Sequence, residues 1–124
     1  MIKGIGIDSI ELDRIERIYG EYGERFLDRI FALEEKEYAL RFEDPVPRLA
    51  ARFAAKEACM KALGTGWNDG VRWRDIAVVN SPSGKPELRL SGRARDFADR
   101  QLVKRIHLSI THSKSHATVV VVFE

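Results

Sequence analysis

Apolar residues recur along this chain with two different periods, and the first period predicts a strand at residues 2–7. Within it Ile5 and Ile7 face one way while two glycines face the other. A glycine in a strand leaves room for a close neighbour, so we expect another segment to approach the backbone on that side. Asp8 and Ser9 are expected to end the strand, and either side chain could cap the helix that follows.

Helical spacing of apolar residues dominates the next part of the chain. It predicts an interrupted helix over 12–31, a short helix at 34–42 and a long helix at about 48–63. The proline-rich segment 44–47 separates the last two helices. Gly64 stands where a left-handed C-terminal cap is expected, so the long helix is predicted to stop there.

The long helix carries its charges in two narrow seams on an alanine-rich rod. Arg52 and Lys56 form one seam, and Glu57 and Lys61 form the other. This pattern predicts packing on more than one side, and buried charges then need partners. Spacing leaves two interpretations of the second seam open. It is either a helical ion pair worth about 0.2–0.5 kcal/mol, or a carboxylate that ligates a hard cation beside an ammonium group that meets phosphate.

The second half of the chain returns to strand patterns. A hairpin is predicted from strands at 75–80 and 87–91, then a helix, then strands at 106–111 and 117–123. The valines of the last strand do not alternate with polar residues, so we expect both of its faces to be covered, in a central strand or at a subunit interface. The order strand, three helices, two strands, helix, two strands predicts one α+β domain over 1–124 with a mostly antiparallel sheet.

Composition and charge restrict the possible functions. Of the 124 residues 44% are hydrophobic and 32% charged, enough for both a core and a polar surface. The net charge is only +2, but residues 71–124 carry ten basic and five acidic groups, which could attract an anionic ligand. No basic run is interleaved with aromatic residues, so nucleic acid is not the expected partner.

Cysteine usage and hydropathy indicate the cellular compartment that we expect for this protein. The single cysteine, Cys59, allows no intramolecular disulfide, and its place in an apolar helix predicts a core residue rather than a catalytic thiol. The longest apolar run, 119–123, is far below the roughly 20 residues that a membrane span needs. No signal peptide is visible, so we expect a cytoplasmic protein with no membrane partner.

Several polar residues could carry chemistry, each with an ordinary alternative. Asp8 follows a glycine-containing strand, where a metal ligand is often found, although capping is the commoner role. The small-residue segment 64–70 could offer backbone N–H groups to phosphate, or it could simply end the helix. It is not a Walker loop, because the lysine precedes the glycines and no strand leads into it.

Three separated pieces of the sequence match one family pattern. They are Gly4-Ile-Gly-Ile-Asp8, then Arg52-Phe-Ala-Ala-Lys-Glu-Ala58 with Lys61 and Gly64-Thr-Gly66, and finally Ser109-Ile-Thr-His-Ser113. Together they closely resemble holo-[acyl-carrier-protein] synthase, the small bacterial 4′-phosphopantetheinyl transferases of fatty acid biosynthesis. The resemblance implies that fold, with a long central helix packed on the sheet. It also implies transfer of the phosphopantetheine arm of coenzyme A to a serine of apo-acyl carrier protein, releasing adenosine 3′,5′-bisphosphate.

The resemblance also implies roles for individual residues. Asp8 and Glu57 match the family's magnesium ligands, and Lys61 matches the lysine that neutralises the pyrophosphate, so these three are the expected catalytic residues. The proton acceptor for the incoming serine stays open between Glu57, a metal-bound water and another carboxylate. The coenzyme A contacts implied are Arg52, Lys61, Gly64, Thr65, Gly66, Ser109, Thr111 and His112.

Partners follow from the same resemblance. The family docks its acidic carrier protein on basic residues of the first helix, and Arg14, Arg17 and Arg25 are the candidates; the alternative is a solvated face of mixed charge. The family places its active site between neighbouring subunits of a homotrimer. The segment 41–48 is less basic than expected, so Arg48 or a residue elsewhere would contact the 3′-phosphate of the nucleotide.

Two other functions remain open on the sequence. One is a non-catalytic basic module that binds a nucleotide or nucleic acid through residues 71–105. The other is a metal-dependent phosphohydrolase that uses water as the acceptor. Transfer of phosphopantetheine to a carrier protein would distinguish the transferase from both of these alternatives.

Overall fold

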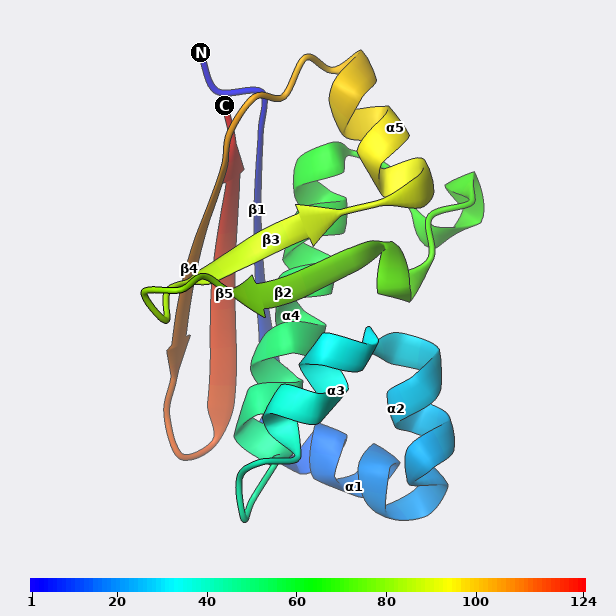
Figure 1. Cartoon of the computed structure of the whole chain (residues 1–124), viewed down its shortest axis with the longest axis vertical. Helices are drawn as coiled ribbons and strands as arrows, with labels where there is room; N and C mark the ends of the chain where they lie inside the picture. Colours follow the sequence, from blue (N-terminus) through cyan, green and yellow to red (C-terminus); the bar gives the residue numbers. More distant parts are fainter.

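The computed structural model describes residues 1–124 and contains two antiparallel sheets. The larger sheet has the order β1-β5-β4, with β5 in the centre. The smaller sheet is the predicted hairpin, β2 paired with β3 (Figure 1). The strands are β1 (Gly4–Glu11), β2 (Ile76–Asn80), β3 (Pro86–Leu90), β4 (Ile106–His112) and β5 (His116–Phe123).

Five α-helices and two short 3₁₀ turns accompany the sheets. Four of the helices lie between β1 and β2 in the chain, and the fifth follows β3. None of them combines the length and the apolarity that a bilayer span requires. The helices are α1 (Leu12–Tyr22), α2 (Glu24–Ile30), α3 (Leu33–Ala39), α4 (Val46–Leu63) and α5 (Gly92–Arg100), and the 3₁₀ turns are η1 (Trp67–Asp69) and η2 (Trp73–Asp75).

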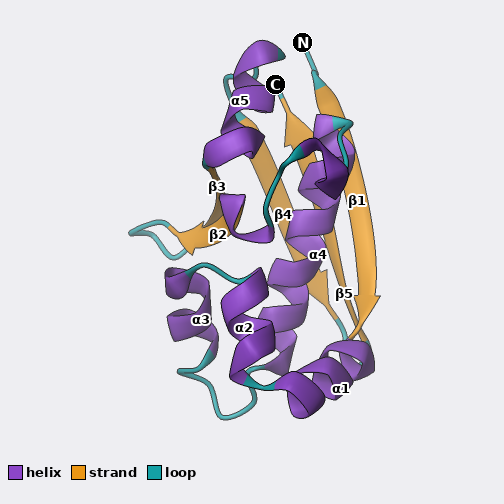
Figure 2. Cartoon of the chain, turned by 90° about the vertical axis from the view of Figure 1, so that its right-hand side faces the viewer, coloured by secondary structure: helices purple, strands orange, loops and turns teal.

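The long helix α4 runs along one face of the larger sheet, and the glycines of β1 allow it to come close (Figure 2). A Cβ atom on Gly4 would lie 2.2 Å from the carbonyl oxygen of Ala62, and one on Gly6 would lie 1.8 Å from that of Ala58. Both distances are impossible contacts, so only glycine fits. The close approach that the sequence predicted on the glycine side is confirmed.

Strand β5 is central, as its valine-rich sequence suggested, but only one of its faces is covered within the chain. Every second residue, from Ala117 to Phe123, is 0% exposed beneath α4. The opposite face of the sheet has no helix on it and presents Ile5 and Ile7, which are 64% and 59% exposed, beside half-buried Val122 and Val120 (Figure 1). Within the chain, therefore, α4 covers one face of β5, and the expected cover on the other face is absent.

The expected strand end and helix cap at Asp8 and Ser9 are wrong, whereas the expected interruption of the following helix is confirmed. Strand β1 continues to Glu11, so neither Asp8 nor Ser9 caps the next helix. The Ser9 hydroxyl instead lies 2.9 Å from that of Thr118 across the sheet. The interrupted helix is two helices, because Gly23 between them adopts a φ of 56° that a residue with a side chain rarely takes.

The C-terminal part of α4 follows the prediction closely. Gly64 ends the helix in the left-handed conformation with φ 73°, and Lys61 lies in the last turn. Cys59 is fully buried, and burial raises the pKa of its thiol to about 12. The predicted role of Cys59 as a core residue rather than a catalytic thiol is confirmed.

Candidate active site

Asp8 and Lys61 meet where β1 crosses α4. The Lys61 ammonium group lies 3.2 Å from Asp8 Oδ1 and donates a 2.8 Å hydrogen bond to the carbonyl oxygen of Ile7. Lys61 thus pairs with Asp8 and forms no ion pair with Glu57, so the helical ion pair considered above is absent. The lysine side chain remains 56% exposed, which leaves it free to meet a ligand.

Glu57 lies one helical turn before Lys61 and shares its electrostatic environment with Asp8. Burial raises the pKa of the Glu57 carboxyl, and the negative charge of Asp8 raises it further. The charges of Arg14 and Lys61 act in the opposite direction. The two carboxylates come from distant parts of the chain, yet Asp8 lies near enough for its charge to affect the pKa of Glu57. No third His, Cys or acidic residue joins them.

The segment after α4 supplies a second feature beside Lys61. The Thr65 hydroxyl is buried and has no hydrogen-bond partner, which is unusual for a buried polar group. The Gly66 N–H donates to Asp69 Oδ2 at 2.8 Å and so is already used. Of the three residues predicted to contact coenzyme A in this segment, Thr65 thus has unused hydrogen-bonding capacity.

Arg52 lies on another side of α4 and is a buried cation with little compensation. It is only 5% exposed, and its Nε atom has no hydrogen-bond partner. Its guanidinium carbon lies 4.5 Å from the centre of the Tyr38 ring, and burial lowers the pKa of the guanidinium while the charge of Glu35 raises it. No carboxylate forms an ion pair with Arg52, so an anion would find an unpaired positive charge here.

A hollow of about 250 Å³ opens beside Arg52, between α3, α4, the β2–β3 turn and β4. Arg48 and His112 line it as well. His112 comes from the face of β4 that is turned toward α4, because it is paired with buried Ala117. Ser109 and Thr111 are exposed on the opposite face of the same strand, so they do not share this hollow.

Apart from Ser109 and Thr111, the predicted site residues therefore form two groups in one chain. Asp8 lies on β1 and His112 on β4, which are the two outer strands on either side of β5. Both side chains are on the α4 side of the sheet, since their partners Val119 and Ala117 on β5 are buried beneath that helix. Helix α4 separates the carboxylate pair, Asp8 and Glu57, from the hollow beside Arg52, which we call the arginine hollow. A single chain therefore does not bring the two groups into one cavity.

Of the three basic residues predicted to bind a partner, Arg14 lies close enough to Glu57 to affect its pKa. Arg14 of α1 has its guanidinium carbon 5.7 Å from the centre of the Phe53 ring, and its charge reaches Glu57. Arg17 is exposed on the same helix. Arg25 of α2 is exposed and lines a separate hollow of about 300 Å³ together with Arg29.

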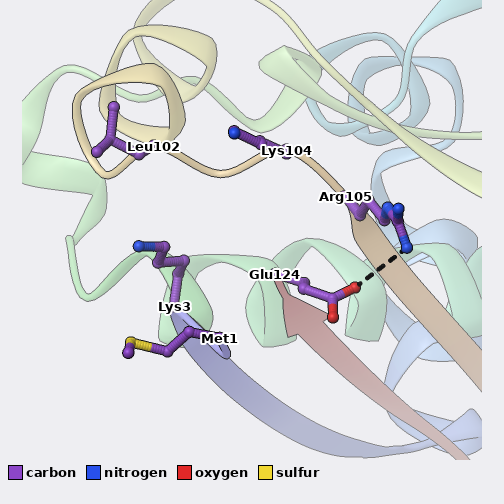
Figure 3. Close-up of a pocket in the computed structure, with 6 residues that line it drawn as sticks. All are labelled: Met1, Lys3, Leu102, Lys104, Arg105 and Glu124. Carbon is purple, nitrogen blue, oxygen red and sulfur yellow. Dashed lines mark ion pairs between the residues drawn. The ribbon is translucent and has the colours of Figure 1, made fainter.

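Another hollow, of about 400 Å³, lies at the two ends of the chain and contains none of the predicted residues (Figure 3). Lys3, Lys104 and Arg105 line it, and all three are exposed. Arg105 lies 3.8 Å from a carboxylate oxygen of Glu124 across its edge. None of the residues predicted to carry the chemistry therefore lines this basic hollow.

Comparison with known proteins assigns the class. The chain belongs to the 4′-phosphopantetheinyl transferase superfamily, whose sequence model matches residues 4–121. Within it, the chain is 48% identical to the holo-[acyl-carrier-protein] synthase of Solibacter usitatus over 124 residues, covering 100% of this chain and 99% of that protein. The family that the three sequence pieces suggested is confirmed.

Solved structures agree with this assignment. The crystal structure of holo-[acyl-carrier-protein] synthase from Neisseria meningitidis has a TM-score of 0.90 and 37% identity, covering 100% of this chain and 99% of that one. The Bacillus anthracis holo-(acyl-carrier-protein) synthase, solved in complex with CoA (3′,5′-ADP), has a TM-score of 0.81 and 41% identity, covering 99% and 96%. The predicted α+β fold of this family is therefore confirmed.

One prominent feature was missed at the sequence level. The ammonium group of Lys56 lies 2.6 Å from Glu35 Oε1, and both side chains are 0% exposed. The sequence predicted a short helix over residues 34–42 and assigned no role to Glu35 within it. The signal that could have found the pair was Lys56 itself, a cation on an alanine-rich helix with no broad polar face.

Proposed function

We propose that this protein transfers the 4′-phosphopantetheine group of coenzyme A to a serine of apo-acyl carrier protein. In this reaction the serine oxygen forms a bond to the β-phosphorus of the pyrophosphate, and the bond from that phosphorus to the bridging oxygen breaks. The products are holo-acyl carrier protein and adenosine 3′,5′-bisphosphate, and the serine gives up its proton. The observation that carries the proposal is that Asp8 pairs with Lys61, and that both of their charges act on Glu57, in a chain of this family.

The two carboxylates fit a magnesium ion. Burial and then the negative charge of Asp8 raise the pKa of Glu57, and a divalent cation held by both carboxylates would relieve the repulsion between their charges. Magnesium prefers few protein carboxylates, with water and phosphate oxygens completing its shell. When bound by Asp8 and Glu57, the ion would supply charge neutralisation to the pyrophosphate.

The chain's own residues account for the remaining steps. The exposed ammonium group of Lys61 would bind a pyrophosphate oxygen and stabilise the charge that develops on the leaving group. A carboxylate has two oxygens, so Glu57 can hold the ion with one and accept a proton with the other, and we assign it the serine proton. The unpaired Thr65 hydroxyl would hydrogen-bond the phosphate from the adjoining segment.

We place the nucleotide end of coenzyme A in the arginine hollow. Buried Arg52 with His112 and Arg48 would hold the 3′-phosphate, because a guanidinium fork binds phosphate through two parallel hydrogen bonds. This group and the carboxylate pair lie on opposite flanks of α4, so one coenzyme A would bridge two neighbouring chains. The uncovered apolar face of β1 and β5 supplies a surface for such assembly, which we propose is a homotrimer.

The carrier protein would dock beside the carboxylate pair. Arg14 lies close enough to Glu57 to affect its pKa, so an acidic partner bound by Arg14 and Arg17 would bring its serine near the reacting phosphate. Arg25 extends the same basic surface onto α2.

Mass spectrometry of the carrier protein tests the proposal directly. Apo-acyl carrier protein is incubated with coenzyme A, magnesium and the enzyme, with and without a chelator. We expect the carrier to gain the mass of one phosphopantetheine with the wild-type protein, and none with Asp8→Ala, Glu57→Ala or excess chelator. Asp99→Ala, an exposed acidic residue of α5, is the matched control and should transfer normally.

The same assay separates the alternatives. Unchanged transfer by Asp8→Ala or Glu57→Ala would contradict the assigned site. Release of adenosine 3′,5′-bisphosphate from coenzyme A without any carrier would indicate a phosphohydrolase instead.

A further inference from the structure

The buried pair Glu35–Lys56 is the one fully enclosed ion pair of the molecule, and every polar atom in it has a partner. Lys56 donates three hydrogen bonds, to Glu35 Oε1 at 2.6 Å, to the carbonyl oxygen of Trp73 at 3.2 Å, and to that of Ile76. These three bonds use all three N–H groups of the ammonium. The pair therefore joins α3, α4, η2 and β2 at a single point.

Glu35 completes the network from the other side. Its Oε1 atom accepts the N–H of Ala32 at 2.9 Å, and its Oε2 atom accepts the N–H of Val78 at 3.0 Å. Replacing a buried ion pair with uncharged residues often costs little stability, so stability alone does not account for such a pair. What the network does fix is the position of each segment that it touches.

The segment with a connection to the reaction is η2. Trp73, whose carbonyl oxygen Lys56 holds, stacks its indole on the Phe53 ring with centroids 4.9 Å apart. The Trp73 indole also stacks on that of Trp67, with ring centroids 4.0 Å apart and ring planes 25° from parallel. Trp67 follows directly after Gly66, the last residue of the segment that holds Thr65.

We propose that Glu35 and Lys56 are positioning residues for the Gly64–Gly66 segment, acting through the Trp73–Trp67 stack. The ion pair fixes the backbone of Trp73, the indole of Trp73 fixes that of Trp67, and Trp67 holds the end of the segment beside Lys61. Glu35 and Lys56 contact no substrate in this arrangement, since both are fully buried. The inference rests on the proposed function, because it assigns that segment to coenzyme A.

The test uses a double variant and a matched control. In Glu35→Gln/Lys56→Gln both charges are removed together, so neither is left buried and unpaired, while the shorter glutamine side chain at position 56 no longer reaches the Trp73 carbonyl oxygen. The control is Glu34→Gln/Arg89→Gln, which removes an exposed ion pair that also links α3 to the hairpin. Circular dichroism reports the stack without any substrate, because the chain has only two tryptophans and stacked indoles couple their transitions.

We expect the Glu35→Gln/Lys56→Gln variant to lose the coupled tryptophan signal and to bind coenzyme A worse. Its KM for coenzyme A should rise about tenfold, while kcat at saturating coenzyme A changes less than about threefold. The Glu34→Gln/Arg89→Gln control should keep both the signal and the KM. A folded variant that retains the wild-type signal and KM overturns the proposal.

Trp67→Ala provides an arm that leaves the buried pair intact. It should raise the KM for coenzyme A by a similar factor, and an unchanged KM overturns the proposal even if the double variant fails to fold. Failure of the proposed function gives a different result, since wild-type protein would then transfer nothing while the loss of the tryptophan signal in the Glu35→Gln/Lys56→Gln variant would still be measurable.

Discussion

At the scale of single residues, the candidate site consists of charged side chains whose charges are not fully balanced or enclosed within the chain. Lys61 is paired with Asp8 but more than half exposed, Glu57 is partly buried beside a like charge, and Arg52 is buried without a carboxylate partner. By contrast, the equally charged Lys56 on the same helix is fully paired. Sequence spacing put all four on α4 but could not distinguish them, because their partners come from β1, α3 and η2.

The raised pKa of Glu57 has a consequence for stability. The folded chain holds the Glu57 proton more tightly than the unfolded chain does, so ionising this carboxyl as pH rises lowers the free energy of unfolding. We expect Glu57→Gln to raise the melting temperature of the metal-free protein at pH 8. The gain should vanish below about pH 4, where the carboxyl is protonated in both states. Thermal melts in chelator across this range measure it.

Exposed Glu87→Gln serves as the control in the same melts and should show no such pH-dependent gain. A Glu57→Gln variant that is less stable than wild type at pH 8 without metal would be evidence against a costly carboxylate at this position.

At the scale of elements, the contact between β1 and α4 determines whether the carboxylate pair can form. Gly6 allows the strand backbone to touch the helix, and Asp8 follows two residues later on the same face. We expect Gly6→Ala to destabilise the fold by about 3 kcal/mol, because its Cβ meets a helix carbonyl that cannot move aside. Denaturant titration measures the loss, and transfer activity should fall with it.

Gly20→Ala is the matched control for this substitution. Gly20 lies inside α1 and has nothing within 4 Å of an added Cβ, so alanine there should stabilise the protein by about 0.5–1 kcal/mol. Destabilisation of equal size by both substitutions would show that the close approach of β1 to α4 is not the cause.

The elements were largely predictable, while their ends and some of their contacts were not. Helical and alternating periods located the long helix, the hairpin and the last two strands, because each buries one face or is buried throughout. The end of β1 was misplaced, since the polar pair Asp8-Ser9 resembles a cap, yet Asp8 is held by Lys61 and Ser9 by Thr118. The Glu35–Lys56 pair joins residues 21 apart in the chain, and local pattern cannot show such a contact.

At the scale of the whole molecule, the two groups that we propose as half-sites lie on opposite flanks of one helix. If neighbouring chains complete each other, an Asp8→Ala chain and an Arg52→Ala chain should restore activity when they assemble together. Random mixing in a ring with head-to-tail contacts leaves about a quarter of the sites intact, so we expect about a quarter of wild-type activity from the mixture. Each variant alone should be nearly inactive.

Co-refolding equal amounts of the two variants and assaying transfer measures this complementation. Mixing Asp8→Ala with Glu57→Ala is the control and should restore nothing, because those two residues belong to the same half-site. Activity no higher than that of the single variants in the first mixture would contradict a site shared between chains.

Strand β1 serves two purposes with alternate residues. Its inner side carries Asp8, and its outer side carries Ile5 and Ile7, which are uncovered within the chain. On the proposed assembly, a newly made chain stays idle until it meets its neighbours. The output of the enzyme would then rise more steeply than the number of chains during early synthesis, so an eight-residue strand would set a threshold for carrier modification.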